Sequence, residues 1–481
     1  MTDSARDRRT YLAGGASTSS TLLVVHDKYS GEPAYEVPVA TPEDVRNAVA
    51  AATEALAHPL PAHERYDVLM RVAAEVEEDA DTYVAALVAE GGKPLKASRA
   101  EVARSVETLR WSAEEAKRLT GEFIPLDASP IGVGRYAVTL REPVGVVAAI
   151  TPTNSPLNLV AHKVGPAIAA GNTVVLKPPQ ATPVCSMLLR DAFARCGLPA
   201  GYLSVVAGPG LGDALQEDDR IDFYNFTGSV EVGAQLRSAV GLRGSLLELG
   251  GNSPVIIHKD AAVKDAARAC ASKAFLAAGQ ACTSVQRIYV HADVEDVFME
   301  ALVEATHGMV VGDPADESTD VGPMISRREA ERVTALIQSA VEDGAELVVG
   351  GRHEGATVWP TILRNVPHSH EAYCGEIFGP AVVVETYTDV LQAADAANDT
   401  PFGLHSAVFT RSLRVAFEVG KRLRTGGVMV NEASQWRTEF MPFGGVKSSG
   451  IGREGPKYAV QEMTVMKVIA LAFPDDGDEV L

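Results

Sequence analysis

Three side chains suited to acyl chemistry lie in short motifs of small and apolar residues. Cys282 lies in AAGQACTSVQR, residues 277–287, two places after a glutamine. Glu248 lies among leucines in LLELGGNSP, where burial is expected to raise the pKa of its carboxyl, as a general base requires. Asn154 follows an apolar run in ITPTNSP, where its amide can donate a hydrogen bond to a developing oxyanion. These residue types are the parts of covalent catalysis.

Each of these side chains also has a simpler interpretation. A free cysteine is commonly a small buried hydrophobe, a glutamate at a strand end can cap or pair, and an asparagine between prolines can form an Asx-turn. The chain has five scattered cysteines, too few for a disulfide framework, and no two have a metal-ligand spacing. We therefore expect free thiols and no metal site; the five are Cys185, Cys196, Cys270, Cys282 and Cys374.

The segments around Asn154 alternate between strands and helices. Apolar runs in residues 141–152, 171–179 and 203–208 predict strands, and residues 156–170 and 182–199 predict helices between them. This alternation favours a parallel sheet with crossover helices, which is the doubly wound α/β class. Ligands in that class bind at the carboxyl ends of the strands.

Two further regions complete the expected architecture. Thr41 is the expected N-cap with Pro42 at the first helical position, and helical patterns then continue to about Ala116. A second alternating region covers about residues 253–430. Without a low-complexity linker between the regions, two closely packed α/β domains are the simplest architecture.

The segment FYNFTGSVEVG has the form of a phosphate site, because glycines follow an apolar strand where a helix begins. It lacks both the G-x-G-x-x-G fingerprint and the P-loop lysine, so an ordinary strand-to-helix turn is the alternative.

The overall charge limits the possible partners. The 481-residue chain has 63 acidic and 43 basic side chains and a formal net charge of −20, which disfavours nucleic acid and anionic membranes. No apolar run approaches the length of a membrane span, and the first thirty residues lack the apolar core of a secretion signal. We expect a cytoplasmic protein with a small-molecule substrate.

Seven motifs occur in an order that resembles the aldehyde dehydrogenase superfamily over about residues 35–470: TPTNSP, GNTVVLKPP, FTGSVEVG, LELGG, GQACTS, EIFGP and PFGGVKSSGIGREG. The resemblance implies two doubly wound Rossmann-like domains and a small oligomerisation hairpin. Residues 1–122 and 142–247 would form the dinucleotide-binding domain, and residues 248–463 the catalytic domain. Residues 123–141 and 464–481 would join a homodimer or homotetramer, where an apolar strand would otherwise be an open edge.

The resemblance also implies a mechanism. The Cys282 thiolate would attack an aldehyde, with the oxyanion held by the Asn154 amide and the Cys282 backbone N–H. Glu248 would then deprotonate the water that opens the thioester to a carboxylic acid. The implied cofactor is NAD or NADP, bound by Thr151, Pro152, Lys177, Gln180, Gly228, Ser229, Leu249, Glu376 and Phe378.

Two positions depart from the family pattern. Gln180 replaces a glutamate that is usual in NAD-preferring relatives, and its neutral amide beside Lys177 makes a 2′-phosphate, and hence NADP, admissible. Thr153 replaces an aromatic residue and makes that wall of the pocket more polar.

The implied substrate residues are Arg110, His162, Thr283, Trp436 and Arg437. Two converging arginines would suit a small aldehyde with a carboxylate, phosphate or phosphonate group. The region resembles the branch of lactaldehyde, phosphonoacetaldehyde and non-phosphorylating glyceraldehyde-3-phosphate dehydrogenases. Against an anionic substrate, relatives that bind strong anions often have arginine where this chain has Ala281.

Two other classes of protein remain as alternatives. A cysteine hydrolase or acyltransferase would use Cys282 with a histidine such as His162 and no redox cofactor. A non-catalytic structural member of the fold would not need Cys282, Glu248 and Asn154 together, and this chain retains all three.

Overall fold

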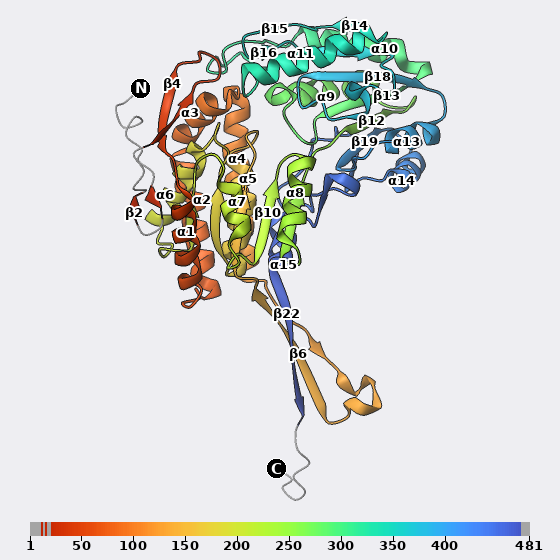
Figure 1. Ribbon diagram of the computed structural model, residues 1–481. Helices are drawn as coiled ribbons and strands as arrows, with labels where there is room; N and C mark the ends of the chain where they lie inside the picture. Colours follow the sequence, from red (N-terminus) through yellow and green to blue (C-terminus); the bar gives the residue numbers. More distant parts are fainter. Residues whose placement is uncertain (1–10, 13–14, 17–20, 473–481) are drawn as a thin grey trace, which may run out of the picture.

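The computed structural model describes residues 11–12, 15–16 and 21–472. The expected segments that include residues 1–10, 13–14, 17–20 and 473–481 extend outside the described residues. Figure 1 shows two α/β bodies side by side and a long arm that projects from them. The predicted α/β class, with parallel sheets, is confirmed.

The first body contains a six-stranded sheet in the order β21-β11-β10-β7-β8-β9. Its parallel strands are β7 (Val146–Ile150), β8 (Thr173–Lys177), β9 (Leu203–Val205), β10 (Phe223–Thr227) and β11 (Gly244–Glu248), and β21 (Gly450–Ile451) is antiparallel at the edge. The chain moves from β7 outward to β9 and returns to the other side of β7 at β10. Ligands bind at such a switch point, and the segment with Asn154 follows β7 there.

Helices cover this sheet as the strand–helix alternation predicted. They are α1 (Pro42–Ala55), α2 (Ala62–Glu78), α3 (Ala80–Gly91), α4 (Leu95–Ala116), α5 (Asn158–Ala170), α6 (Val184–Arg195), α7 (Leu211–Glu217) and α8 (Val230–Val240). Thr41 caps α1 as expected, since its Oγ1 accepts from Asp44 N at 3.2 Å. The helical region up to Ala116 consists of four helices, α1 to α4, and α3 ends before α4 because Gly92 is left-handed and Pro94 follows it.

The second body contains a seven-stranded sheet in the order β14-β17-β18-β13-β12-β19-β20. These strands are β12 (Ser253–Ile257), β13 (Val285–His291), β14 (Glu346–Val349), β17 (Thr361–Arg364), β18 (Ala381–Tyr387), β19 (His405–Phe409) and β20 (Gly427–Val430), and only β14 pairs antiparallel. Its helices are α9 (Val263–Phe275), α10 (Glu295–His307), α11 (Arg327–Glu342), α12 (Glu371–Cys374), α13 (Val390–Asn398) and α14 (Leu413–Arg422). Both sheets therefore follow the doubly wound pattern.

Short hairpins flank the two bodies. They are formed by β1 (Tyr11–Leu12) with β2 (Gly15–Ala16), β3 (Leu22–His26) with β4 (Pro33–Pro38), and β15 (His353–Glu354) with β16 (Thr357–Val358). None of the helices in the described part of the chain is both long and apolar enough to cross a bilayer.

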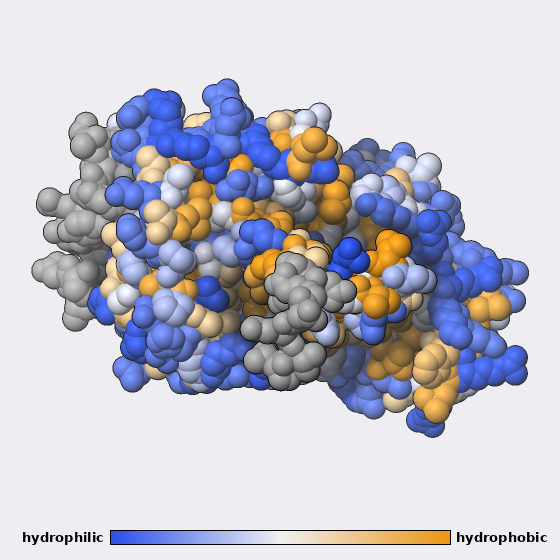
Figure 2. All heavy atoms as spheres, turned by 90° about the horizontal axis from the view of Figure 1, so that it is seen from below, coloured by the Kyte–Doolittle hydropathy of each residue, from blue (hydrophilic) through white to orange (hydrophobic). Residues whose placement is uncertain are grey.

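The arm is a three-stranded sheet in the order β22-β6-β5. β22 (Thr464–Ala472) pairs along its whole length with β6 (Arg135–Pro143), and β5 (Phe123–Ile124) adds a short edge. All of β22 after Thr464 is exposed, including its apolar side chains Val465, Met466, Val468, Ile469 and Leu471. Figure 2, seen from the side of the arm, shows apolar side chains among the hydrophilic ones on this face.

The C-terminal helix α15 (Pro456–Glu462) returns to the first body. Ala459, Val460 and Met463 are buried in the same apolar core as α2, α4 and α5. The segment from β21 to α15 therefore packs with the first sheet, whereas the expected boundary at residue 463 groups it with the second.

Candidate active site

The three predicted catalytic residues line one pocket of about 340 Å³ between the two bodies. The pocket collects residues from the carboxyl ends of β7, β10 and β11 and from the loops of the second body. Its lining is Pro152, Thr153, Asn154, Thr227, Gly228, Ser229, Glu248, Leu249, Gly250, Cys282, Glu329, Arg332, Glu376 and Phe378. Residues far apart in sequence thus meet at the sheet edge where the fold class predicts a ligand.

Glu248 is the last residue of β11 and is 1% exposed. Neither carboxyl oxygen has a hydrogen-bond partner among the described residues. Burial, and then the negative charge of Glu454, raise the pKa of Glu248 to about 8. Burying a carboxyl without a hydrogen-bond partner costs folding free energy. The raised pKa of Glu248 suits a general base near neutral pH.

Cys282 lies in the loop before β13. Burial raises the pKa of its thiol well above the ordinary value, Glu248 raises it further, and the positive charge of Arg437 acts in the opposite direction. The thiol is therefore protonated at neutral pH, and a base must take its proton before the sulfur can attack.

The loop before Cys282 is fixed by an unusual backbone and by its glutamine. Ala277 and Ala278 have φ of 51° and 54°, which costs L-residues about 1–2 kcal/mol each. Gln280 Oε1 accepts from the backbone N–H of Ile325 at 2.9 Å. Gln280 thus anchors the strained loop before Cys282 to the segment of Ile325.

Asn154 lies in the turn between β7 and α5, and its Oδ1 is buried without a partner among the described residues. An Asx-turn would use that oxygen as an acceptor, so the structure does not support this alternative. The backbone carbonyl of Asn154 accepts from Lys93 Nζ at 3.0 Å, and Lys93 forms a buried ion pair with Glu101. Glu101 also accepts from the N–H groups of Leu157 and Asn158 at 3.0 and 3.1 Å, which fixes the start of α5.

The predicted cofactor residues follow the same sheet edge. Ser229 caps α8 by accepting from Val232 N at 3.3 Å, so the N-terminus of this helix lies at the pocket. Glu376 Oε1 accepts from Gly251 N at 2.9 Å, and burial raises the pKa of Glu376 to about 7. Of the nine expected residues, Pro152, Gly228, Ser229, Leu249, Glu376 and Phe378 line the pocket.

The other three lie along the carboxyl ends of β7 and β8, beyond the pocket lining. Lys177 ends β8, its carbonyl accepts from Thr151 N at 3.3 Å, and burial lowers the pKa of its ammonium. Gln180 is exposed in the turn that follows.

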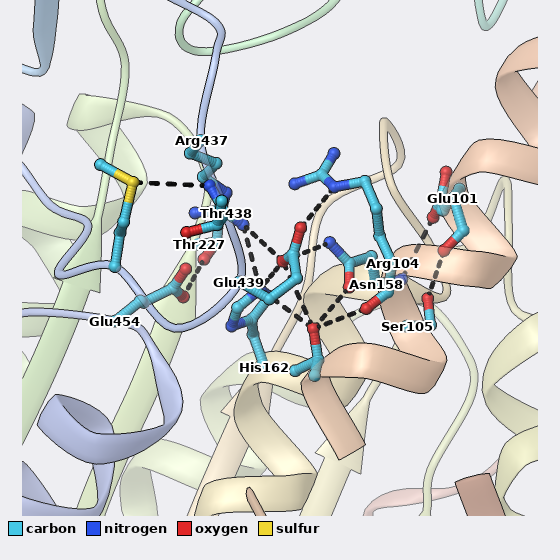
Figure 3. A network of polar contacts seen from close by, with 12 residues as sticks. Glu101, Arg104, Ser105, Asn158, His162, Thr227, Arg437, Thr438, Glu439 and Glu454 are labelled. Carbon is cyan, nitrogen blue, oxygen red and sulfur yellow. Dashed lines mark hydrogen bonds and ion pairs between the residues drawn. The ribbon is translucent and has the colours of Figure 1, made fainter. Parts of the chain in front are cut away.

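Four of the five predicted substrate residues lie around the loop after β20. Thr283 is buried beside Cys282, and its carbonyl accepts from Ser434 Oγ at 2.9 Å, which ties this loop to the nucleophile segment. Trp436 is 40% exposed, whereas the Arg437 side chain is 9% exposed and its guanidinium lies 4.0 Å above the Phe443 ring. His162, on α5, is fully buried and lies 3.1 Å from Arg437 Nη2 (Figure 3).

The environment of His162 bears on the hydrolase alternative. Its Nε2 lies 2.6 Å from Glu439 Oε2 and also contacts Thr108 and Arg437, and its Nδ1 has no partner among the described residues. A thiol hydrolase requires a histidine hydrogen-bonded to the nucleophile. No hydrogen bond joins His162 to Cys282 in the described structure, so the geometry does not favour that class.

Arg110 does not converge with Arg437. Its Nη2 donates to Glu77 Oε2 at 2.6 Å on the neighbouring helix α2. The α4 arginine at the loop is Arg104, whose Nε donates to Glu439. Six residues of an α-helix rotate a side chain by about 240°, so Arg104 and Arg110 lie on different faces of α4.

Several buried charged residues of the site were not predicted. Lys163 and Glu454 form a fully buried ion pair at 3.1 Å next to Glu248. Glu439, 2% exposed, connects α4, α5 and the loop of Arg437. A signal was present for Glu439, because EFMPFGG places a carboxylate among apolar residues as LLELGG does for Glu248.

The comparisons with known proteins agree with this geometry. The family model described as "Aldehyde dehydrogenase family" matches residues 16–469. A 3-sulfolactaldehyde dehydrogenase of Priestia aryabhattai is 46% identical, with 96% of this chain and 97% of that protein covered. Aldehyde dehydrogenase 21 of Physcomitrella patens, solved with the product succinate, has a TM-score of 0.94 at 36% identity, covering 97% and 98%. A glyceraldehyde-3-phosphate dehydrogenase of Methanocaldococcus jannaschii, complexed with NADP, has a TM-score of 0.89 at 36% identity, covering 97% and 100%.

The two parallel sheets meet at one pocket, and this pocket contains a thiol, a carboxyl and an amide. This fold and this site are those of an α/β enzyme. The matches cover nearly the whole chain. The chain belongs to the aldehyde dehydrogenase family and is an oxidoreductase.

Proposed function

We propose that the protein oxidises a small anionic aldehyde to the carboxylic acid through a thioester on Cys282, with NAD or NADP as hydride acceptor. The observation that supports this most strongly is the joint presence of Cys282, Glu248 and Asn154 in one pocket. Arg437 does not line this pocket, but its positive charge acts on the Cys282 thiol, and its buried Nη1 has no partner among the described residues.

The residues present fit a nicotinamide dinucleotide. The N-terminus of α8 presents backbone N–H groups suited to phosphate, and the Glu376 carboxylate suits ribose hydroxyls. Gly250 leaves room beside Glu376, since a Cβ there would lie 2.4 Å from Glu376 Oε2. Lys177 and the neutral Gln180 do not repel the 2′-phosphate of NADP, so we include both NAD and NADP as cofactors. The chemistry that the bound dinucleotide supplies is acceptance of a hydride from the aldehyde carbon.

The chain's own residues perform the remaining steps. The Cys282 thiol gives its proton to solvent, and the sulfur forms a bond to the aldehyde carbon. The Asn154 amide and the Cys282 N–H donate to the resulting oxyanion. After oxidation the acyl group is held on sulfur as a thioester. Glu248 then accepts a proton from water, the hydroxide oxygen bonds to the acyl carbon, and the thiolate leaves.

The relatives support an anionic substrate. They include a 3-sulfolactaldehyde dehydrogenase, an aldehyde dehydrogenase solved with the dicarboxylate product succinate, and a glyceraldehyde-3-phosphate dehydrogenase. A guanidinium with unfilled donors in a buried site is the group that recognises such anions.

Arg437→Met tests this assignment, because it removes the charge and keeps an apolar stem of similar length. We expect kcat/KM for 3-sulfolactaldehyde to fall at least about 30-fold, the effect of removing a buried charge contact, while uncharged lactaldehyde changes less than about threefold. Formation of reduced dinucleotide, measured with NAD and with NADP, gives both numbers and the cofactor preference. An equal loss for both aldehydes, or a wild-type enzyme without preference for the anionic one, would contradict the anionic substrate.

We also infer that a second copy of the chain covers the arm, as a homodimer or homotetramer. The exposed apolar side chains of β22 lie on an open sheet edge that would otherwise invite aggregation. Light scattering is expected to give the mass of two or four chains, and Val468→Lys is expected to lower it. A stable wild-type monomer would refute this inference.

A further inference from the structure

Glu439 is the centre of a buried polar cluster that surrounds Arg437 (Figure 3). Its Oε2 accepts from Asn158 Nδ2 at 3.2 Å and lies 2.6 Å from His162 Nε2, both on α5. Its Oε1 accepts from Arg104 Nε on α4. Glu439 is thus fixed from two helices while it lies two residues from Arg437.

The position of the proton on the His162 ring leaves the Arg437 guanidinium with too few hydrogen-bond acceptors for its N–H groups. A carboxylate only accepts hydrogen bonds, so the contact with Glu439 requires the proton on Nε2 of His162. That nitrogen then cannot accept from Arg437 Nη2, which lies 3.1 Å away. Arg437 Nη2 is 3.8 Å from Glu439 Oε2, and Nη1 has no partner among the described residues. The guanidinium therefore has free donors although its side chain is only 9% exposed.

The charges of the cluster can be counted. Burial opposes ionisation of Glu439, but the His162 hydrogen bond and the charges of Arg437 and Arg104 outweigh it and hold its pKa well below the usual range. Burial, and then Arg437, lower the pKa of His162, so its ring is neutral at pH 7. One negative charge thus faces the positive charges of Arg104 and Arg437. The nearby Lys163–Glu454 pair adds no net charge.

We propose that Glu439 limits this subsite to one uncompensated positive charge and thereby selects a singly charged anionic group, sulfonate or carboxylate, over a doubly charged phosphate or phosphonate. The second charge of a dianion would enter a buried site without a counter-charge, which is unfavourable. This inference rests on the proposed function, in which Arg437 binds the anionic end of the aldehyde.

The test compares 3-sulfolactaldehyde with its phosphonate isostere at a pH where the phosphonate is doubly charged. The two substrates have the same shape and differ by one charge. Glu439→Gln keeps the side-chain size and one acceptor oxygen, removes the negative charge, and replaces the other acceptor with an NH2 donor. We expect it to raise the phosphonate-to-sulfonate ratio of kcat/KM at least about tenfold, because the subsite then has two positive charges.

A purely structural Glu439 would leave that ratio unchanged while both rates fall, and this result would overturn the inference. If wild type prefers 3-sulfolactaldehyde over uncharged lactaldehyde and the ratio still does not move, only the role of Glu439 fails. If wild type shows no such preference, the proposed anionic substrate fails as well.

A second variant tests the charge count while it keeps the buried carboxylate in place of an amide. Arg104→Gln removes a half-exposed arginine, so Glu439 would neutralise Arg437. We expect kcat/KM for the sulfonate to fall at least about tenfold and that for lactaldehyde to change less than about twofold. Arg110→Gln is the matched control, since Arg110 is equally exposed on the same helix but pairs with Glu77, and it is expected to change neither rate. Equal effects of the two variants would overturn the inference.

Discussion

Cys282→Ala is expected to lower the rate of aldehyde oxidation at least about 10⁴-fold, while the affinity for the dinucleotide changes less than about twofold. The thiol is the proposed nucleophile and lies in the pocket with Glu248 and Asn154, and alanine cannot form the acyl bond. The proposed dinucleotide contacts of Glu376 and Ser229 do not involve the sulfur. Reduced-dinucleotide formation and titration of dinucleotide binding measure the two effects.

Cys196→Ala is the control for this substitution. Cys196 is also a partly exposed thiol, but it lies at the end of α6, where its Sγ is 3.0 Å from Glu75 Oε2 of α2, and it does not line the pocket. Its loss is expected to leave turnover unchanged. Near-normal turnover in Cys282→Ala, or failure of mass spectrometry to find an adduct on Cys282 during catalysis, would refute the covalent mechanism. Ester cleavage by the wild type without any reduction of the dinucleotide would favour the hydrolase class.

Glu248→Gln is expected to give one rapid turnover followed by a steady rate about 10²–10⁴-fold below wild type. Glutamine fills the same buried position at the end of β11 but cannot accept a proton from water. The thioester then forms and hydrolyses slowly. Stopped-flow measurement should show a burst of reduced dinucleotide equal to the enzyme concentration. Steady turnover without a burst would contradict a role of Glu248 in hydrolysis.

The pH dependence of thioester hydrolysis provides an independent check on Glu248. Because burial and Glu454 raise its pKa to about 8, the carboxylate form that acts as base predominates only above that pH. Hydrolysis in the wild type should therefore accelerate about tenfold per pH unit below 8 and level off above it. The Glu248→Gln enzyme should lack this rise. A wild-type rate that is constant from pH 6 to 8 would show that another group acts as the base.

The sequence determined the parts of the protein that depend on near neighbours in the chain. Thr41 and Pro42 specify the start of α1, because the cap and its first-turn acid lie three residues apart. Alternating strand and helix patterns specify parallel sheets, and the carboxyl ends of their strands then specify where Asn154, Gly228 and Glu248 meet. The chemistry proposed for Cys282 and Glu248 could also be predicted, because the apolar residues that flank each side chain are its neighbours in the sequence.

Which charged residues contact one another depends on the tertiary structure and could not be predicted from the sequence. Arg104 and Glu439 are separated by 335 residues, and the rotation of α4 determines that Arg104, and not Arg110, reaches the loop. The Lys163–Glu454 pair and the packing of α15 on the first body also join distant segments. Such contacts depend on how helices and loops dock, and a local sequence pattern contains no information about that docking. The charge around Arg437, and with it the choice of anion that we propose, is therefore a property of the folded chain.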